Sequence, residues 1–490
     1  MSSFPFKLLR GTSLGTMALL LASCAVGPDF VRPSPPDADR YTRKTLPAVT
    51  LAADGKTQRF MPDAVIPSDW WKLFRSPPLD ATVEQALAHN ATLEASEASL
   101  RQSQDNLRAG YGVFFPHAEG DFGATRERSS PAQQGSQGAG SIFNLITLSG
   151  TVSYAPDVFG GERRTVEGLQ AKADYQRYET KAAYLTLSAN VVNTCIARAA
   201  YAAEIRETEQ LIELEKQQLH AIEVQVHAGI ASYSGLLSQR SLIAGHQASL
   251  APLKQQVSQA EHLLATLEGV LPEKVILPEI DLATLFLPPD LPVSLPSDLV
   301  RQRPDILSSE AQLHAASAGI GVATAAMFPS FSLSGTFGAA GSSFGKLSPF
   351  WSIGPSATIP VFQGTSLWYG RRAAIDLYQQ SQATYRQTVL AAFAQVADSL
   401  DALEHDAEAL RAQTDSRRDA AEALDLLQIN YRTGLASGLD VLAGDVQFHE
   451  ATLSYLQAVA QRHQDTVALY VALGGGWWNP VIAEEKEAIQ

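Results

Sequence analysis

Cysteine is scarce in this chain, because only Cys24 and Cys195 occur among its 490 residues. Since Cys24 stands at the end of an N-terminal targeting segment, we expect no intrachain disulfide. Positive charge is also in the minority: 37 Lys and Arg stand against 51 Asp and Glu, and the formal net charge is −14. This balance excludes a basic nucleic-acid-binding protein. Charged residues make up only 18% of the chain, below the level typical of soluble domains, which indicates extensive contact between helices.

Catalytic and metal-binding motifs are missing as well. The sequence contains no HExxH, no CxxC and no phosphate-binding loop. A GxSxG pattern at residues 11–15 lies in the targeting segment, and Gly319-Ile320-Gly321 lacks the third glycine of a dinucleotide site. His220 and His227 are too far apart on one helix to share a metal ion without other ligands. We therefore expect no enzymatic activity, no cofactor and no bound metal.

The first 23 residues have the features of a signal peptide. Lys7 and Arg10 supply a positive n-region, and residues 14–21 form an apolar run too short to span a bilayer. Leu21-Ala22-Ser23-Cys24 also resembles the bacterial lipobox, in which the cysteine thiol receives a diacylglyceryl group. The alternative is an ordinary signal peptide with an incidental cysteine. No later stretch reaches the ~18 apolar residues of a spanning helix, so any membrane crossing is expected from β-strands.

The chain after residue 70 repeats itself, with an offset of about 200 residues between the copies. Phe115-Pro116 recurs as Phe328-Pro329, and residues 228–232 recur as residues 433–437. Each copy is expected to contain a short helix, two strands, a long helix, a tight turn and a long return helix. A proline-rich stretch between the copies cannot be helical throughout and is predicted to connect them.

The long segments of both copies carry apolar residues every seven positions. This period specifies left-handed coiled-coil packing, and its presence on outgoing and return segments predicts two antiparallel helical hairpins. The outgoing segment at residues 162–228 would extend roughly 100 Å as a helix. Gly229 and Gly434 stand where each outgoing helix must end, a place that favours glycine in the left-handed conformation. The heptad positions are Ile205, Ile212, Leu219 and Val226 in the first copy and Val389, Val396, Leu403 and Leu410 in the second.

Four segments between the short and long helices alternate with a period of two. Phe331, Leu333 and Phe337, for example, alternate with serine and threonine. This pattern is typical of a membrane barrel with lipid outside and water inside, although a soluble sandwich also fits it. Two hairpins cannot close a barrel, and open strand edges in lipid leave backbone groups unsatisfied at a cost of several kcal/mol each. A lipid-facing sheet therefore requires several chains to share one barrel.

With these features the chain resembles the outer membrane efflux protein (TolC-like) family. Within that family it is most similar to the lipoprotein branch that serves resistance-nodulation-division efflux systems. The resemblance implies a mainly α fold with a transmembrane β portion, in which a homotrimer forms one 12-stranded β-barrel and a periplasmic α-helical tunnel. It also implies three kinds of partner: outer-membrane lipid, a periplasmic adaptor protein and an inner-membrane pump. The segments that carry it are residues 70–74, 154–160, 301–306, 326–330, 359–362 and the closing Gly474-Gly475-Gly476-Trp477.

The resemblance further implies roles for individual residues. Cys24 is the expected lipidation site, and Tyr431 and Asp440 match the residues that narrow the periplasmic aperture. Three Asp440 carboxylates around a three-fold axis would favour cations, although Asp440 could simply begin the return helix. The expected adaptor-contact turns contain Gly229, Ile230, Ser232, Gly434, Leu435 and Ser437.

Some family features are absent at the expected aperture. Where the family has a second acidic residue on the return helix, this chain has Ala443. Where some members have an arginine that locks the turn, it has Ala436, and the first-copy counterpart of Asp440 is Gly235. Asp445 could substitute for the missing acid.

We predict the outer-membrane channel of a tripartite efflux system, a passive trimeric duct that exports small molecules. Two alternatives stay open: the duct of a type I protein secretion system, and a lipid-anchored periplasmic coiled-coil scaffold without a channel. The predicted organisation begins with a signal peptide at 1–23 and a lipid-anchored proline-rich tether at 24–69. A first repeat follows at 70–270, with a β-hairpin at about 113–158 and a coiled-coil hairpin at about 162–268. A connector at 271–296 leads to a second repeat at 297–478, with a β-hairpin at about 329–362 and a coiled-coil hairpin at about 364–473, and a C-terminal tail at 479–490.

Overall fold

The computed structural model describes residues 25–44, 47–62, 64–129 and 140–479. The predicted signal peptide, Cys24 and nearly all of the predicted C-terminal tail lie outside these residues. The described chain divides into two compact units, each assembled from three separate stretches. Among the described residues, unit 1 is built from residues within 25–33, 99–176 and 308–386, and unit 2 from residues within 34–98, 177–307 and 387–479.

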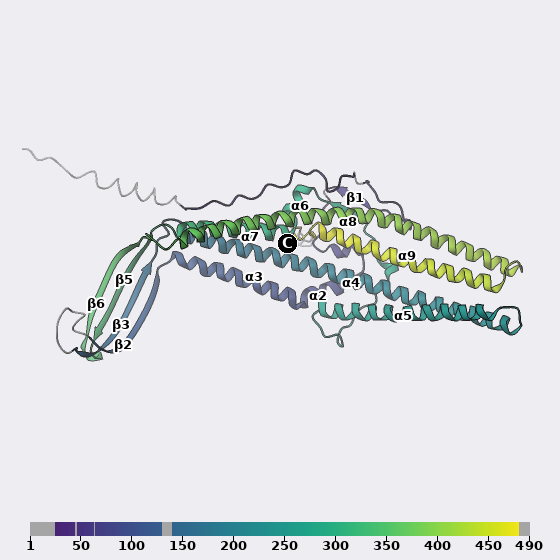
Figure 1. Ribbon diagram of the computed structural model, residues 1–490, viewed down its shortest axis with the longest axis horizontal. Coiled ribbons are helices and arrows are strands. Elements are labelled where there is room, and N and C mark those ends of the chain that lie inside the picture. Colours follow the sequence, from purple (N-terminus) through teal and green to yellow (C-terminus); the bar gives the residue numbers. More distant parts are fainter. Residues whose placement is uncertain (1–24, 45–46, 63, 130–139, 480–490) are drawn as a thin grey trace, which may run out of the picture. The chain divides into compact units, whose positions relative to one another are not determined.

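Unit 1 contains a four-stranded antiparallel sheet with the order β2-β3-β5-β6 (Figure 1). The strands are β2 (His117–Arg128), β3 (Ile142–Tyr154), β5 (Ser330–Gly341) and β6 (Leu347–Thr358). Each sequence copy supplies one hairpin, and the pairing of β3 with β5 joins the two hairpins. The predicted four strands are therefore confirmed, and they form one sheet.

The register of this sheet places most of its apolar residues on a single face. Phe122 is paired with Leu148, and Phe337 with Trp351. Trp351 is 73% exposed and Phe337 70% exposed in the chain, so the apolar face is uncovered. The opposite face is mostly polar, although Phe350 lies on it beside Gly338. Thr151 and Thr336 share a hydroxyl hydrogen bond of 3.1 Å on this face. The sheet thus has the oily face and the small polar face that the alternation predicts.

Two long helical hairpins follow the strands (Figure 1). Helix α4 (Gly161–His227) turns into α5 (Tyr233–Leu267), and α8 (Ser366–Arg432) turns into α9 (Gly438–Ala472). Both outgoing helices have 67 residues and both return helices have 35, which shows the duplication at the level of whole elements. The buried heptad positions include Ile212, Val389, Val396, Leu403 and Leu410.

The remaining helices are shorter. They are α2 (Pro77–His89), α3 (Ala91–Gly110), α6 (Pro296–Gln302) and α7 (Pro304–Ala325), with short 3-10 turns at 70–74, 111–114, 282–284 and 344–346. Among the described residues, none of the helices combines the length and the hydropathy that crossing a membrane would require.

The proline-rich segment before residue 70 differs from a simple tether. Its strand β1 (Arg59–Pro62) pairs in parallel with β4 (Asp290–Val293) of the connector. Gln58 is fully buried and donates to the Thr466 hydroxyl of α9 at 3.2 Å. A four-residue strand among prolines leaves no periodic signal, which is why the sequence indicated only an extended segment.

A run of three glycines follows α9. Residues 474–476 all have positive φ, between 68° and 94°, a conformation that glycine adopts without steric cost. A Cβ on Gly476 would collide with the backbone carbonyl of Ile66. Trp477 then donates its indole N–H to the Gln302 carbonyl at 2.8 Å. The glycines therefore let the end of the second repeat pack closely within unit 2.

Candidate functional site

The turn between α4 and α5 contains the first set of predicted contact residues. Gly229 has φ +74° and ends the outgoing helix in the left-handed conformation, as predicted. Ile230 and Ala231 donate their N–H groups back to the Gln225 carbonyl at 2.9 and 3.2 Å, and the Ile230 side chain is 79% exposed. Ser232 caps α5 by accepting a hydrogen bond from the Gly235 N–H. The turn is closed by backbone hydrogen bonds and a serine cap, and it presents an apolar side chain to its surroundings.

The turn between α8 and α9 has the same backbone but a stronger cap. Gly434 has φ +78°, Leu435 donates to the Asn430 carbonyl at 2.8 Å, and the Leu435 side chain is 82% exposed. Ser437 and Asp440 form a capping box, in which each side chain bonds the backbone N–H of the other. Because Gly235 has no side chain, the first turn cannot form such a box.

Asp440 begins the return helix, as the simpler interpretation of this residue expected. Its Oδ2 accepts hydrogen bonds of 2.8 Å from both the N–H and the hydroxyl of Ser437. These bonds to the Ser437 backbone and side chain lower the pKa of Asp440 below its ordinary value. The carboxylate is exposed and therefore remains available to ions as well as to the helix.

The other residues of the expected aperture lie along the same hairpin. Tyr431 is 56% exposed, and its ring lies within 4 Å of the position that a Cβ on Gly438 would take. Ala443 is exposed and Asp445 is half-buried. Burial raises the pKa of Asp445, with a smaller opposing effect from His449. Asp440 and Asp445 are thus both acidic groups of α9, in different surroundings.

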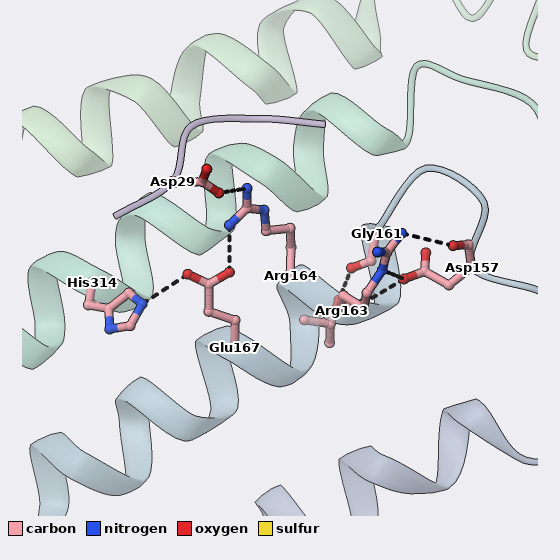
Figure 2. A network of polar contacts seen from close by, with 8 residues as sticks. Asp29, Asp157, Gly161, Arg163, Arg164, Glu167 and His314 are labelled. Carbon is pink, nitrogen blue, oxygen red and sulfur yellow. Dashed lines mark hydrogen bonds and ion pairs between the residues drawn. The ribbon is translucent and has the colours of Figure 1, made fainter. Parts of the chain in front are cut away.

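The segment that directly follows Cys24 is held against α4 and α7, within unit 1, by a polar network that the sequence did not indicate (Figure 2). Asp29 accepts a 2.6 Å bond from Arg164 of α4, whose side chain is only 7% exposed. Arg164 also binds Glu167 at 2.7 Å, and Glu167 in turn contacts His314 of α7 at 2.9 Å. Phe30 stacks on the His314 ring with 4.3 Å between centroids. These residues come from three distant parts of the chain, so no local motif could have revealed them.

Two glycines allow the same segment to approach the helices closely. The N–H of Val26 donates to the Phe159 carbonyl at 3.0 Å, and a Cβ on Gly160 would lie 2.7 Å from Ala25. A Cβ on Gly27 would lie 2.5 Å from the Cα of Gly321. The chain after Cys24 is therefore fixed where β3 leads into α4.

Asp157 lies in one of the segments that carry the family resemblance, and it caps the start of α4. Its carboxylate accepts the backbone N–H of Glu162 at 3.1 Å and of Arg163 at 2.9 Å, and Figure 2 shows the Arg163 side chain against the same carboxylate. The N–H groups of the first helical turn have no partner inside a helix. Asp157 satisfies two of them where α4 begins.

Comparison with known proteins agrees with this architecture. The family model described as outer membrane efflux protein matches residues 82–270 and 295–475. The chain belongs to the outer membrane efflux protein family. It is 30% identical to the pyoverdine export outer membrane protein OpmQ of Pseudomonas putida, covering 83% of this chain and 88% of that protein.

Two further comparisons cover more of the chain. The probable efflux pump outer membrane protein TtgC of Pseudomonas putida is 28% identical, with 97% of both chains covered. The solved structure of the outer-membrane channel OprN has a TM-score of 0.81 and 26% identity, and it covers 93% of this chain and 100% of that one.

Membership of the family establishes the general role of the chain. It is an outer-membrane channel protein of an efflux system, and members of this family are transporters rather than enzymes. The predicted fold class, location and general function are thereby confirmed. The roles of individual residues remain predictions.

Proposed function

We propose that three copies of this chain close one 12-stranded β-barrel and continue into a periplasmic helical tunnel, which makes a passive trimeric duct. The observation that carries the proposal is the four-stranded sheet of unit 1. Its apolar face is exposed, and its edge strands β2 and β6 each pair on one side only among the described residues. In lipid, an open strand edge leaves backbone groups unsatisfied at several kcal/mol each. Edges supplied by further copies would remove this cost.

The turns at Gly229 and Gly434 are proposed to contact the hairpins of a periplasmic adaptor, through which an inner-membrane pump delivers the exported molecules. Support comes from the exposed Ile230 and Leu435, which stand on backbones fixed by left-handed glycines and by Ser232 or Ser437 caps. Exposed apolar side chains on rigid turns lose little conformational entropy when a partner covers them.

Asp440 and Tyr431 are proposed to line the periplasmic aperture. An exposed carboxylate whose pKa is lowered stays negatively charged, and a ring of such groups favours cations over anions. In this role the Ser437–Asp440 capping box would fix the charge as well as the helix end.

Cys24 is proposed to carry a lipid after cleavage of the signal peptide. The segment that follows it is held at the transition from β3 to α4 by the Asp29–Arg164 ion pair and the Val26 hydrogen bond. A lipid on Cys24 would then enter the outer membrane beside the lipid-facing sheet.

The exported cargo is proposed to be small molecules. The relatives named above export pyoverdine or serve a probable efflux pump. A water-filled duct selects weakly, so we assign the choice of compound to the pump.

The test is an efflux assay in cells that lack the chromosomal copy of the gene. The wild-type chain is expected to restore export of a fluorescent pump substrate. Ile230→Asp and Leu435→Asp should reach the outer membrane but accumulate the dye, because they place a charge in the adaptor contact. Ile276→Asp is the control, since Ile276 is 92% exposed in the connector. Normal export by both turn variants would contradict the adaptor contact.

A further inference from the structure

A cavity of about 230 Å³ lies inside unit 2, between the segment at residues 53–56 and helices α8 and α9. Most of its lining is aliphatic, and its polar groups gather on the α9 side and on the N-terminal segment. The lining residues are Ala53, Asp54, Lys56, Leu282, Ala283, Leu285, Leu287, Leu410, Tyr455, Val459, Arg462 and His463.

Two deeply buried polar side chains of this lining have nitrogen atoms without a partner among the described residues. Arg462 is 1% exposed; its Nε donates to Gln58 at 3.0 Å and its Nη2 to Thr50 at 3.1 Å. Its Nη1 and the Nδ1 of His463, a residue only 3% exposed, make no hydrogen bond. Leaving such groups unpaired is costly, especially when one of them is charged.

The cavity also has a surplus of positive charge. Asp406 is an acidic group that acts electrostatically on the Arg462 guanidinium. Burial, together with Asp465, raises the pKa of Asp406, which weakens this carboxyl as a counter-ion for Arg462. Asp54 accepts a hydrogen bond from the Tyr455 hydroxyl at 2.7 Å. Lys56 lines the cavity, and it forms no ion pair with an acidic side chain of the described residues.

His463 is neutral in this setting. Burial, with added repulsion from Lys56 and Arg462, lowers the pKa of His463 to about 3. A neutral imidazole can donate or accept at Nδ1, according to its tautomer. The cavity therefore offers three polar groups beside its aliphatic side chains. They are the Arg462 guanidinium, the Nδ1 atom of His463, which can donate or accept, and the exposed Lys56 ammonium group.

We infer that this cavity binds a small aromatic monocarboxylate, with the carboxylate against Arg462 and the ring among Leu282, Leu285 and Leu410. The volume fits, because an apolar cavity of about 150 Å³ already holds one benzene. The charge fits as well, since one carboxylate would neutralise the guanidinium and accept from its unpaired N–H. Seven of the twelve lining residues are aliphatic, which leaves too few donors for a phosphate dianion. The inference does not depend on the trimer or on the adaptor contact.

The experiment is calorimetric titration of the detergent-extracted full-length protein with benzoate at neutral pH. We expect one site per chain and at least about tenfold weaker binding of the neutral isostere benzamide. Val459→Phe fills the cavity and should weaken benzoate binding by about tenfold or more. Lys56→Gln removes an exposed charge and should weaken it by about threefold. The matched control is Lys44→Gln, which removes a lysine of the same segment that lies outside this cavity and pairs with Glu404.

Three outcomes would overturn the inference: no benzoate binding up to about 10 mM, benzamide binding as tightly as benzoate, or unchanged binding in both cavity variants. If Val459→Phe fails to fold, the comparison of Lys56→Gln with Lys44→Gln and of benzoate with benzamide still decides the question. None of these results bears on efflux, so failure here is distinguishable from failure of the proposed function.

Discussion

Replacing Arg303 by alanine should release the C-terminal end of α9. Arg303 is 6% exposed and donates to the Ala472 carbonyl at 2.8 Å and to the Gln395 side chain at 2.8 Å. It also forms a two-point ion pair with Asp305, at 3.0 and 2.7 Å. The Ala472 carbonyl is among the last of α9, which have no partner within the helix. One arginine thus joins α9, α8 and the start of α7 within unit 2.

The magnitude follows from what the substitution leaves behind. The ion pair contributes little by itself, about 1 kcal/mol, because Asp305 is partly exposed. The larger loss comes from the two acceptors on Ala472 and Gln395, each of which loses a bond to a charged donor worth about 1.5–3 kcal/mol. We expect Arg303→Ala to lower the free energy of opening at the α9 terminus by about 3–6 kcal/mol.

Hydrogen–deuterium exchange of the last turns of α9 measures this directly. At 1.4 kcal/mol per factor of ten, the amides should exchange about two to four orders of magnitude faster in Arg303→Ala. Arg301→Ala is the control, since Arg301 is exposed and two residues away. Arg303→Lys should be intermediate, because an ammonium cannot reproduce the planar two-point contact. Equal exchange in the Arg303→Ala and Arg301→Ala variants would refute the reasoning.

Three further predictions concern the strand face, the second turn and the glycine run. Trp351→Lys should destabilise the membrane-inserted protein by about 2–4 kcal/mol in a urea titration in vesicles, whereas Ser352→Lys on the polar face should stay near the wild type; equal effects would contradict the assignment of faces. Since Ser437 lowers the pKa of Asp440, the carboxylate stays charged as the pH falls through the ordinary carboxyl range, and cation preference in a planar bilayer should persist there. Ser437→Ala should raise the pKa of Asp440, so that the cation preference is lost at a higher pH than in the wild type. An unchanged pH profile would exclude Asp440 as the selective group. Gly476→Ala combines a positive φ with a backbone collision and should lower the free energy of unfolding by more than about 2 kcal/mol; an unchanged urea midpoint would show that the turn can relax.

Local periodicity made the long elements predictable. Heptads over the outgoing and return segments identify α4, α5, α8 and α9, because each buried stripe depends only on residues close in sequence. Alternation identifies the strands in the same way, and the exposed Trp351 and Phe337 lie on the face it predicts. The sequence also placed Asp440 at the start of the return helix, whereas its capping box with Ser437 was found only in the structure.

Contacts between distant segments could not be predicted. The β1–β4 pair joins residues more than two hundred positions apart, and Arg462 reaches Gln58 across 404 positions. The Asp29–Arg164 ion pair is of the same kind. Their energy comes from burial and from long-range geometry, neither of which leaves a repeating pattern in the chain. This is why a segment expected to be a tether is in part a packed element.

The native mass of the detergent-extracted protein tests the central claim, a duct shared by several chains, most directly. We predict three mature chains in one particle, each carrying the added mass of a lipid on Cys24. A protein that remains monomeric in mild detergents would contradict it, because one chain leaves the edges of β2 and β6 open.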